Sequence, residues 1–190
     1  MQLEAIATRM FADRGFEAVT VDEIVAAADV SHRTFYRYFP SKEDVLLGDH
    51  QAKVDAFVAA VRARPADESA FDALRAAVLD FADGYEQDQD RNATRARVVH
   101  ETPCLAQRVS EKQLAWEQAL TPVLAERIVG VPDADLQARL MVACALGVMR
   151  AAIDRWIAVG PARSLRDLVD ESFETLANGF APASPPASPR

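Results

Sequence analysis

The sequence predicts an all-α protein with a small N-terminal unit and a larger helical C-terminal domain. Apolar residues recur at helical spacing through almost the whole chain, and no run of alternating β-branched residues predicts a strand. Gly and Pro residues divide the chain into segments of helical length. Half of the 190 residues are apolar, which is enough for a sizeable core.

The first two helices are predicted from their end signals. One is expected from Gln2 to Arg14, because Gly15 can adopt the left-handed conformation that ends a helix. Thr20 and Glu23 have the spacing of a capping box, in which the hydroxyl and the carboxylate satisfy backbone N–H groups. A second, short helix is therefore expected from Val21 to Ala28.

The next two helices follow closely. Ser31 is a suitable N-cap for a third helix from His32 to Tyr38, and Pro40 prevents its continuation. A fourth, longer helix is expected to begin at Ser41 and to end before Pro65.

Five further helices are expected between Pro and Gly residues: Ser69 to Gln87, Asp90 to Glu101, Leu105 to Val129, Asp133 to Val159 and Ser164 to Phe180. Pro122 is expected to bend or split the helix that contains it. The segment "APASPPASPR" has nothing to bury and is expected to be disordered. The predicted units are thus residues 1–47, residues 48–180 and a tail of residues 181–190.

Composition limits the function. The net charge of −8 argues against nonspecific coating of nucleic acid, but it leaves room for a local DNA-binding face. Cys104 and Cys144 form neither a disulfide framework nor a cysteine-rich zinc site. There is no signal-peptide pattern, and the longest apolar stretch, Leu140 to Met149, is too short to span a bilayer. A cytoplasmic protein is expected.

One stretch of this acidic chain is basic and aromatic. No acid occurs from His32 to Lys42, and the cations and hydroxyl donors there are Arg33, Tyr36, Arg37, Tyr38 and Lys42. Two short helices joined by a tight turn and packed on a longer helix form a helix-turn-helix, whose second helix enters the major groove of DNA. This stretch is therefore predicted to bind DNA.

The stretch "FADRGFEAVTVDEIVAAADVSHRTFYRYFPSKEDVLL" resembles the DNA-binding domain of the TetR family of bacterial transcriptional regulators. The resemblance implies a homodimer that binds a palindromic operator. It implies DNA contacts by Thr20, His32, Arg33, Thr34, Tyr36, Arg37, Tyr38 and Lys42, with Thr20 and Lys42 anchoring the phosphate backbone. Arg33 is the best candidate for reading a guanine. For Tyr36 and Tyr38, a ring half-buried against the neighbouring helix is the alternative.

Three departures from the family pattern accompany this resemblance. The family often has glycine where Asp29 and Arg33 stand. Asp29 tolerates a tight turn, and Arg33 adds a donor to the recognition helix. The family also usually carries a basic arm before its first helix, whereas Met1 lies almost at that helix. Either the arm is absent or the true start lies upstream of Met1, and we expect no minor-groove contact from the residues given.

The resemblance further implies that the C-terminal domain pairs two subunits through its last two helices. From Leu140 to Ile153 only Arg150 is charged, so this helix is expected to be buried nearly all round. The predicted interface residues are Ala145, Val148, Ala152 and Phe173. The alternative is that these residues complete the core of a single chain.

A ligand cavity is expected among the fifth to eighth predicted helices. Its predicted lining residues are Phe81, Tyr85, Val98, Leu105, Trp116, Leu120, Met141, Cys144 and Met149. Core packing is the alternative for each. Arg95 and Arg97 are suited to meet a carboxylate or phosphate, with a solvated face as the alternative. The segments "VVHETPCLAQRV" and "RAAIDRWIAVG" resemble a TetR subgroup that includes the mycofactocin-system regulator, which implies an apolar, acyl-CoA-like effector.

Other classes of protein find less support. None of His32, His50 and His100 belongs to a recognisable catalytic or metal-binding pattern, and no glycine-rich phosphate loop occurs. No enzyme, metal or cofactor is therefore expected. Two alternatives remain: a thiol-responsive regulator that uses Cys104, and a helical small-molecule or protein-binding module without operator-specific DNA binding. The favoured prediction is a repressor released by a small effector.

Overall fold

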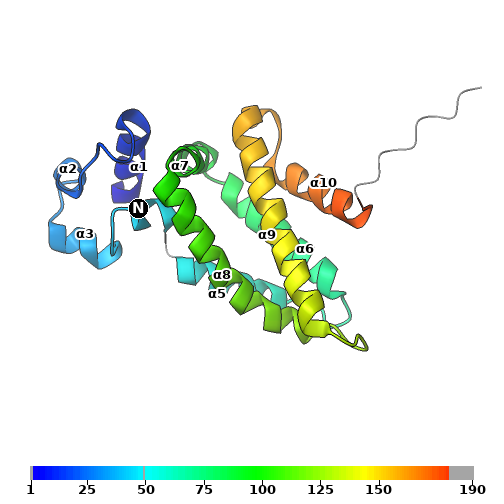
Figure 1. Ribbon diagram of the computed structural model, residues 1–190. Helices are drawn as coiled ribbons and strands as arrows, with labels where there is room; N and C mark the ends of the chain where they lie inside the picture. The colour runs from blue at the N-terminus through cyan, green and yellow to red at the C-terminus, as the bar shows by residue number, and fades with distance from the viewer. Residues whose placement is uncertain (1, 49, 180–190) are drawn as a thin grey trace, which may run out of the picture.

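The computed structural model describes residues 2–48 and 50–179, and every regular element within these ranges is helical. The N-terminal unit contains α1 (Gln2–Arg14), α2 (Val21–Ala27), α3 (His32–Tyr38) and α4 (Asp44–Leu47). It forms one end of an elongated molecule (Figure 1). The predicted fold class is confirmed.

The rest of the chain is a bundle of longer helices, with a short 3₁₀ turn (Gly160–Ala162) before the last one. These helices are α5 (His50–Arg62), α6 (Ala70–Glu86), α7 (Gln89–Glu101), α8 (Pro103–Ala125), α9 (Ala134–Val159) and α10 (Leu165–Ala177). Figure 1 shows α7 and α8 beside the N-terminal unit, with α10 at the far end. The tail predicted to be disordered lies outside the described residues.

The prediction of a single helix from Ser41 to before Pro65 is wrong, because this segment forms two helices, α4 and α5. Gly48 has a φ of 67° and ends α4, and its N–H donates to the Asp44 carbonyl over 2.8 Å. Glycine takes this left-handed conformation without a steric penalty, which explains why the chain turns here. A four-residue helix therefore connects the N-terminal unit to α5.

Pro122 does not split α8. The helix continues through Pro122 and ends at Ala125, earlier than the predicted end at Val129. Pro122 removes one backbone hydrogen bond, and the helix ends within one turn after it.

Two hydrophobic cores divide the molecule. The larger core joins α5, α6, α8, α9 and α10, and the smaller one fills the N-terminal unit. Phe11, Phe35 and Ile24 belong to the smaller core. It also contains Val98 of α7 and Leu105 of α8, which are 6% and 0% exposed. The N-terminal unit thus completes its core with two side chains from the C-terminal part of the chain.

Only one side of α9 is buried, which corrects the expectation that it is buried all round. Its inner side packs against α6, α8 and α10. Its outer side exposes Leu136, Leu140, Ala143, Cys144 and Ala151. By length and composition alone α9 would suffice to cross a membrane, and 28% of its most apolar window is buried in the chain. The core helix of a soluble protein meets the same criteria, so this is weak evidence for a membrane span.

Candidate nucleic-acid interface and ligand region

The N-terminal ends of α2 and α3 have the predicted caps. The backbone N–H of Thr20 donates to Oε2 of Glu23 over 2.9 Å, and the backbone N–H of Glu23 donates to Oγ1 of Thr20 over 3.3 Å. Asp29 has a φ of 51°, a conformation that the short polar side chain of aspartate tolerates. Ser31 then caps α3 by accepting the N–H of Thr34 over 3.1 Å. These local contacts fix the direction in which α3 leaves the turn.

The same capping box carries a titratable group. The pKa of Glu23 is lowered to about 2, first by the backbone N–H of Thr20 and then by the guanidinium of Arg14 and the Thr20 hydroxyl. Nη2 of Arg14 lies 2.6 Å from Oε1 of Glu23. All three partners favour the charged carboxylate. The Thr20 hydroxyl is therefore already engaged in the cap, although the residue remains exposed as a DNA contact requires.

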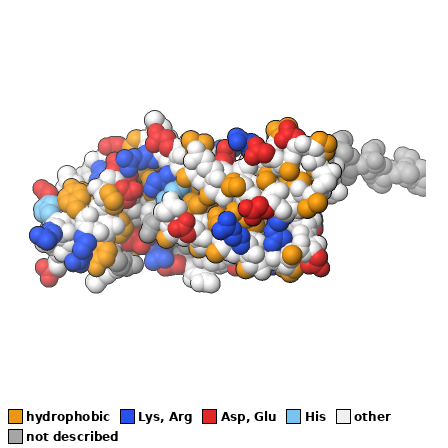
Figure 2. Space-filling model, turned by 90° about the horizontal axis from the view of Figure 1, so that it is seen from below, with side chains coloured by type: hydrophobic (Ala, Val, Ile, Leu, Met, Phe, Trp, Pro, Cys, Tyr) orange, Lys and Arg blue, Asp and Glu red, His pale blue; other side chains and the backbone are white. Residues whose placement is uncertain are grey.

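The outer side of α3 presents a row of exposed donors. Arg33 and Arg37 are exposed, and Tyr36 and Tyr38 keep 52% and 50% of their surface. Nη2 of Arg37 donates to the Tyr38 hydroxyl over 3.0 Å, with the guanidinium 4.7 Å from the centre of the tyrosine ring. Lys, Arg and His side chains gather at this end of the molecule (Figure 2). Half-exposure leaves both tyrosines able to pack and to reach DNA.

The first turn of α3 makes a contact that the sequence reading missed. Nε2 of His32 lies 2.7 Å from Oδ1 of Asp22, and both side chains are largely exposed. Oγ1 of Thr34 lies 3.0 Å from Oγ of Ser31. An acid thus lies next to a predicted DNA contact. Asp22 lies on α2, ten residues before His32, so a search for acids from His32 onward did not include it.

Lys42 lies differently from the phosphate contact predicted for it. Its Nζ donates to the carbonyls of Phe16 and Val19 over 2.9 and 3.0 Å, and it lies 4.1 Å from the centre of the Phe16 ring. These bonds tie the loop after α1 to the segment before α4. Lys42 is therefore a structural residue of the N-terminal unit, with one ammonium N–H left over.

The residues predicted to line a ligand cavity do not all come together. Trp116, Phe81 and Phe57 form a ring cluster, with centroids 5.4 to 6.2 Å apart, and Tyr85 adjoins Phe81. Three of the other predicted lining residues share the larger core with this cluster, and three do not. Val98 and Leu105 fill the N-terminal core, Leu120 lies in the larger core, Met141 and Met149 pack on that core, and Cys144 is exposed.

The sequence reading also missed residues of the ring cluster. Phe57 belongs to it, and Trp156 adjoins it, since the Trp156 ring lies 6.0 Å from that of Tyr85. Neither residue is among the predicted lining residues. Their aromatic character was the available signal, because large rings in one core often pack edge to face.

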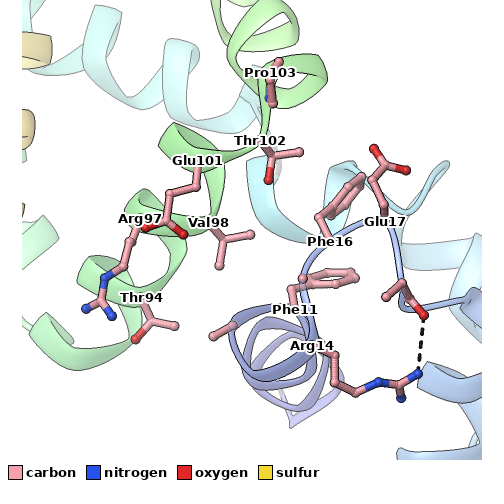
Figure 3. A pocket seen from close by; sticks show the side chains of 13 residues that line it. Phe11, Arg14, Phe16, Glu17, Thr94, Arg97, Val98, Glu101, Thr102 and Pro103 are labelled. Atoms are coloured by element: carbon pink, nitrogen blue, oxygen red, sulfur yellow. Dashed lines mark hydrogen bonds between the residues drawn. The ribbon is translucent and has the colours of Figure 1, made fainter.

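A groove of about 420 Å³ lies between α1 and α7, away from the ring cluster. Figure 3 shows Phe11 and Phe16 on one side and Val98 on the other, with Arg14, Glu17, Arg97 and Glu101 around them. Acids and guanidinium groups are both present, so the groove has no single charge preference. Arg97 lies here, whereas the guanidinium of Arg95 lies 5.4 Å from the centre of the Tyr85 ring.

The four residues predicted to form a dimer interface are all buried within the single chain. Ala145, Val148, Ala152 and Phe173 are between 1% and 6% exposed and belong to the larger core. This burial agrees with the alternative stated above. An interface on these helices would have to use the opposite, exposed side of α9.

The surroundings of Cys104 do not favour a redox sensor. Desolvation and the neighbouring carboxylate of Glu17 raise the pKa of the Cys104 thiol, and the Sγ to Oε1 distance is 3.5 Å. A raised pKa disfavours the reactive thiolate. Cys144 is exposed, which corrects its expected burial. Among the described residues, no cluster of three or more His, Cys, Asp or Glu side chains could hold a metal ion.

Two known protein families match this chain. The family described as "Bacterial regulatory proteins, tetR family" matches residues 5–48, and the family described as "MftR C-terminal domain" matches residues 68–181. The chain belongs to the TetR family of bacterial regulators. The first match ends at Gly48, where the chain turns after α4, and the second begins just before α6, so that α5 lies between the two matched segments.

Individual relatives agree with this assignment. TcmR, an HTH-type transcriptional regulator of Streptomyces glaucescens, is 34% identical over 82% of this chain and 71% of its own length. A protein of Mycobacterium tuberculosis named as the mycofactocin biosynthesis transcriptional regulator MftR is 29% identical over 92% of this chain and 87% of its own length. These relatives are transcriptional regulators and not enzymes.

Solved structures show the same fold. FadR of Thermus thermophilus, a TetR-family repressor in complex with lauroyl-CoA, aligns with a TM-score of 0.61 and 23% identity over 100% of this chain and 98% of its own. FadR of Bacillus subtilis, in complex with stearoyl-CoA, aligns with a TM-score of 0.65 and 20% identity over 95% of this chain and 99% of its own. At these identities the likeness concerns the fold alone.

Proposed function

We propose that this TetR regulator is a cytoplasmic repressor that binds a palindromic operator as a homodimer and is released by an apolar, acyl-bearing effector. The observation that carries the proposal is the exposed outer side of α3. Arg33, Tyr36, Arg37 and Tyr38 all lie there, on a helix whose direction is fixed by two caps. Such a helix can enter the major groove, where Arg33 is suited to bind O6 and N7 of a guanine.

The described contacts assign different tasks to the predicted DNA-binding residues. Arg33 and Thr34 are proposed to meet bases, and Arg37 and Tyr38 to meet phosphates as a joined pair. For His32 to contact DNA, either its contact with Asp22 has to break or the carboxylate of Asp22 has to lie close to the DNA as well. Residues 2–47 are proposed as the DNA-binding unit, with Val98 and Leu105 as the contribution of the C-terminal domain to its core.

The exposed side of α9 is proposed to hold the second subunit. Gly147 lies in the middle of this helix, and a Cβ built on it would meet no described atom within 4 Å. Glycine inside a helix costs about 1 kcal/mol relative to alanine, and nothing inside the chain requires it. Close approach of another backbone would explain it. A two-fold axis near Gly147 would bring Leu140 and Ala143 of both subunits together.

A second feature supports this face. A small groove of about 180 Å³ lies between α9 and α10, lined by small or polar side chains that include Ala151, Ser172 and Thr175. Leu136 and Leu140 are exposed by 51% and 58% towards the other end of α9. Antiparallel crossing of two α9 helices would bring the leucines of one subunit towards the groove of the other. Pairing of this kind matches the two half-sites of a palindrome.

The effector is proposed to enter the ring cluster of Phe57, Phe81 and Trp116. Structures of similar fold hold lauroyl-CoA and stearoyl-CoA, which supports an acyl chain as the ligand. The three rings pack on one another, so an acyl chain entering here has to separate them. Trp116 lies on α8, and its movement would be transmitted along that helix.

The other end of α8 contacts the N-terminal unit. Nη1 of Arg108 lies 3.2 Å from Oγ of Ser41, and Nζ of Lys112 lies 3.4 Å from Oδ1 of Asp44. Lys112 is one turn from Trp116. An effector that favours a displaced α8 would thus favour a different position of α4 and α3, and it weakens operator binding by its difference in affinity for the two states.

Selection of bound sequences from random duplex DNA tests this proposal directly. The purified full chain is expected to enrich a two-fold symmetric site, and lauroyl-CoA or stearoyl-CoA is expected to release it. Absence of any enriched site from a folded, dimeric protein would contradict the proposed function. An enriched site that neither thioester releases would retain the DNA-binding regulator and reject the acyl effector.

A further inference from the structure

A second group of side chains adjoins the ring cluster, where α6, α7 and α9 meet. Tyr85 is at its centre. The Trp156 ring lies 6.0 Å from the Tyr85 ring at an interplanar angle of 69°, and the guanidinium of Arg95 lies 5.4 Å from its centre. Nδ2 of Asn92 donates to the Tyr85 carbonyl over 2.6 Å, which holds the beginning of α7 against the end of α6.

Two buried hydrogen-bond donors, one on α9 and one on α7, have no partner among the described residues. Nε1 of Trp156 and Nε of Arg91 are both buried and make no hydrogen bond to any described residue. Trp156 is only 1% exposed. Buried donors are paired in the great majority of proteins, because an unpaired one loses its bond to water without replacement. Each such group therefore needs an explanation.

The acids nearby are already engaged. Asp88 pairs with the Nη2 end of Arg91 over 3.1 Å, and Oε1 of Glu86 accepts the backbone N–H of Leu165 over 2.6 Å. Asp154 lies 3.7 Å from Nδ1 of His100. Asp88 thus compensates part of the charge of Arg91, whereas Glu86 and Asp154 are engaged with other groups, and the indole N–H of Trp156 and the guanidinium of Arg95 have no acid among these partners.

The two arginines add further donors to this junction. Arg91 and Arg95 are one turn apart on α7, so their side chains leave the same face of the helix. A cationic group entering the junction would meet two guanidinium groups. A neutral or anionic oxygen would instead meet an indole N–H and guanidinium N–H groups.

We propose that this junction binds the carbonyl or carboxylate oxygen of an effector whose apolar chain lies in the adjoining ring cluster. Nε1 of Trp156 donates to that oxygen, and Arg91 and Arg95 make the site unfavourable for cations. This inference rests on the proposed function, since it assigns the polar end of the same effector. It adds a selection rule: apolar chains that carry an acceptor are bound, and chains that carry only donors are rejected.

The experiment compares three probes with the same carbon chain on the purified full-length protein. Dodecanoate carries an anionic acceptor, methyl dodecanoate a neutral acceptor, and dodecylammonium only donors. Binding is measured by calorimetry or by tryptophan fluorescence. Dodecanoate and methyl dodecanoate are expected to bind at least about tenfold more tightly than dodecylammonium. If only dodecanoate binds, the oxygen is that of a carboxylate, and if both acceptors bind, a neutral carbonyl suffices.

Two matched variants assign the contact. Trp156→Phe keeps an aromatic ring but removes the indole N–H, and it is expected to weaken both acceptor probes about tenfold while leaving dodecylammonium unchanged. Trp116→Phe removes the other tryptophan of the region and is expected to change all three probes alike. Equal effects of the two variants on every probe, or equal binding of dodecylammonium and dodecanoate, would overturn the inference.

Operator binding, measured in parallel, separates the two levels of failure. If the operator is bound and released by another effector while Trp156→Phe changes nothing, the acceptor site is wrong and the proposed function stands. If no operator is bound by the folded protein, the proposed function is wrong. If none of the three probes binds, the acceptor site is also rejected.

Discussion

The outer sides of α3 and α9 both remain exposed in the single chain, but they expose opposite kinds of surface. On α3 the exposed side chains are arginines, tyrosines and a histidine. On α9 they are leucines, alanines and a cysteine around Gly147, with charged side chains such as Arg150, Asp154 and Arg155 towards the end of the helix. The first suits a polyanion, whose binding weakens as salt is added, and the second suits another apolar surface, whose binding does not. Two partners of different chemistry are therefore expected on one chain.

The largest expected effect comes from blocking the α9 face. Gly147→Leu places a side chain where the second subunit is proposed to approach, and it is expected to convert the dimer to monomer at micromolar concentration. Operator affinity should then fall more than about 100-fold, because a single half-site contact remains. Analytical ultracentrifugation and an operator-binding assay measure the two effects.

Gly84→Leu is the matched control for this change. Gly84 lies within α6, and a Cβ added there also meets no described atom within 4 Å. Both leucines favour the helix over glycine, so both variants should fold. Dissociation of the two variants to the same extent, or of neither, would reject the assignment of the α9 face.

The next largest effect concerns the recognition of DNA bases by side chains of α3. Arg33→Ala is expected to cost about 1–3 kcal/mol at one operator position and to relax the base preference there. Competition assays with operators substituted at each position measure this pattern. A uniform loss across all positions would instead indicate that Arg33 contacts only phosphate.

A change at Lys42 is expected to act through folding. Lys42→Ala removes the donors to the carbonyls of Phe16 and Val19 and should lower the free energy of unfolding by about 1–3 kcal/mol. Operator affinity should fall alike for all sequences as the N-terminal unit loosens. Thermal unfolding and operator titration, with Arg33→Ala as the comparison, test this. Unchanged stability with a reduced salt dependence would restore the phosphate contact first predicted for Lys42.

The smallest expected effect is a dependence of stability on acid. The folded-state pKa of Glu23 is lowered from 4.5 to about 2, so its contribution to stability is fully present above pH 4.5 and is lost as the pH falls towards 2. Glu23→Gln should remove this part of the pH dependence between these values. Urea unfolding at several pH values measures it, with Asp22→Asn as the control on the same helix. An identical acid profile in the two variants would contradict the assignment.

Most of the N-terminal unit could be predicted because its signals are local. Thr20 and Glu23 make the capping box that their spacing predicts, and Ser31 caps α3. The position of Lys42 could not be predicted, because its partners are backbone carbonyls more than twenty residues away. No side-chain pattern marks a carbonyl that lacks a donor.

The C-terminal part was predicted less well, although its helices were found. Sequence spacing identified α9 but not which side of it faces inward, because almost the whole helix is apolar. Ala145 and Val148 were therefore assigned to the interface but lie in the core. Gly147 alone could not identify the outer side, because Gly84 of α6 is a helical glycine with equally open surroundings.

The sharing of one core by the two parts has a consequence for engineering. Removal of the chain after residue 47 would leave Phe11 and Phe16 without Val98 and Leu105, which pack in the same cluster. The isolated N-terminal unit would then expose an apolar surface to water and would be prone to aggregate. A hybrid regulator that joins this N-terminal unit to another ligand-binding domain should therefore retain the segment from α7 to α8. Alternatively, the new domain should supply side chains that fill the space of Val98 and Leu105.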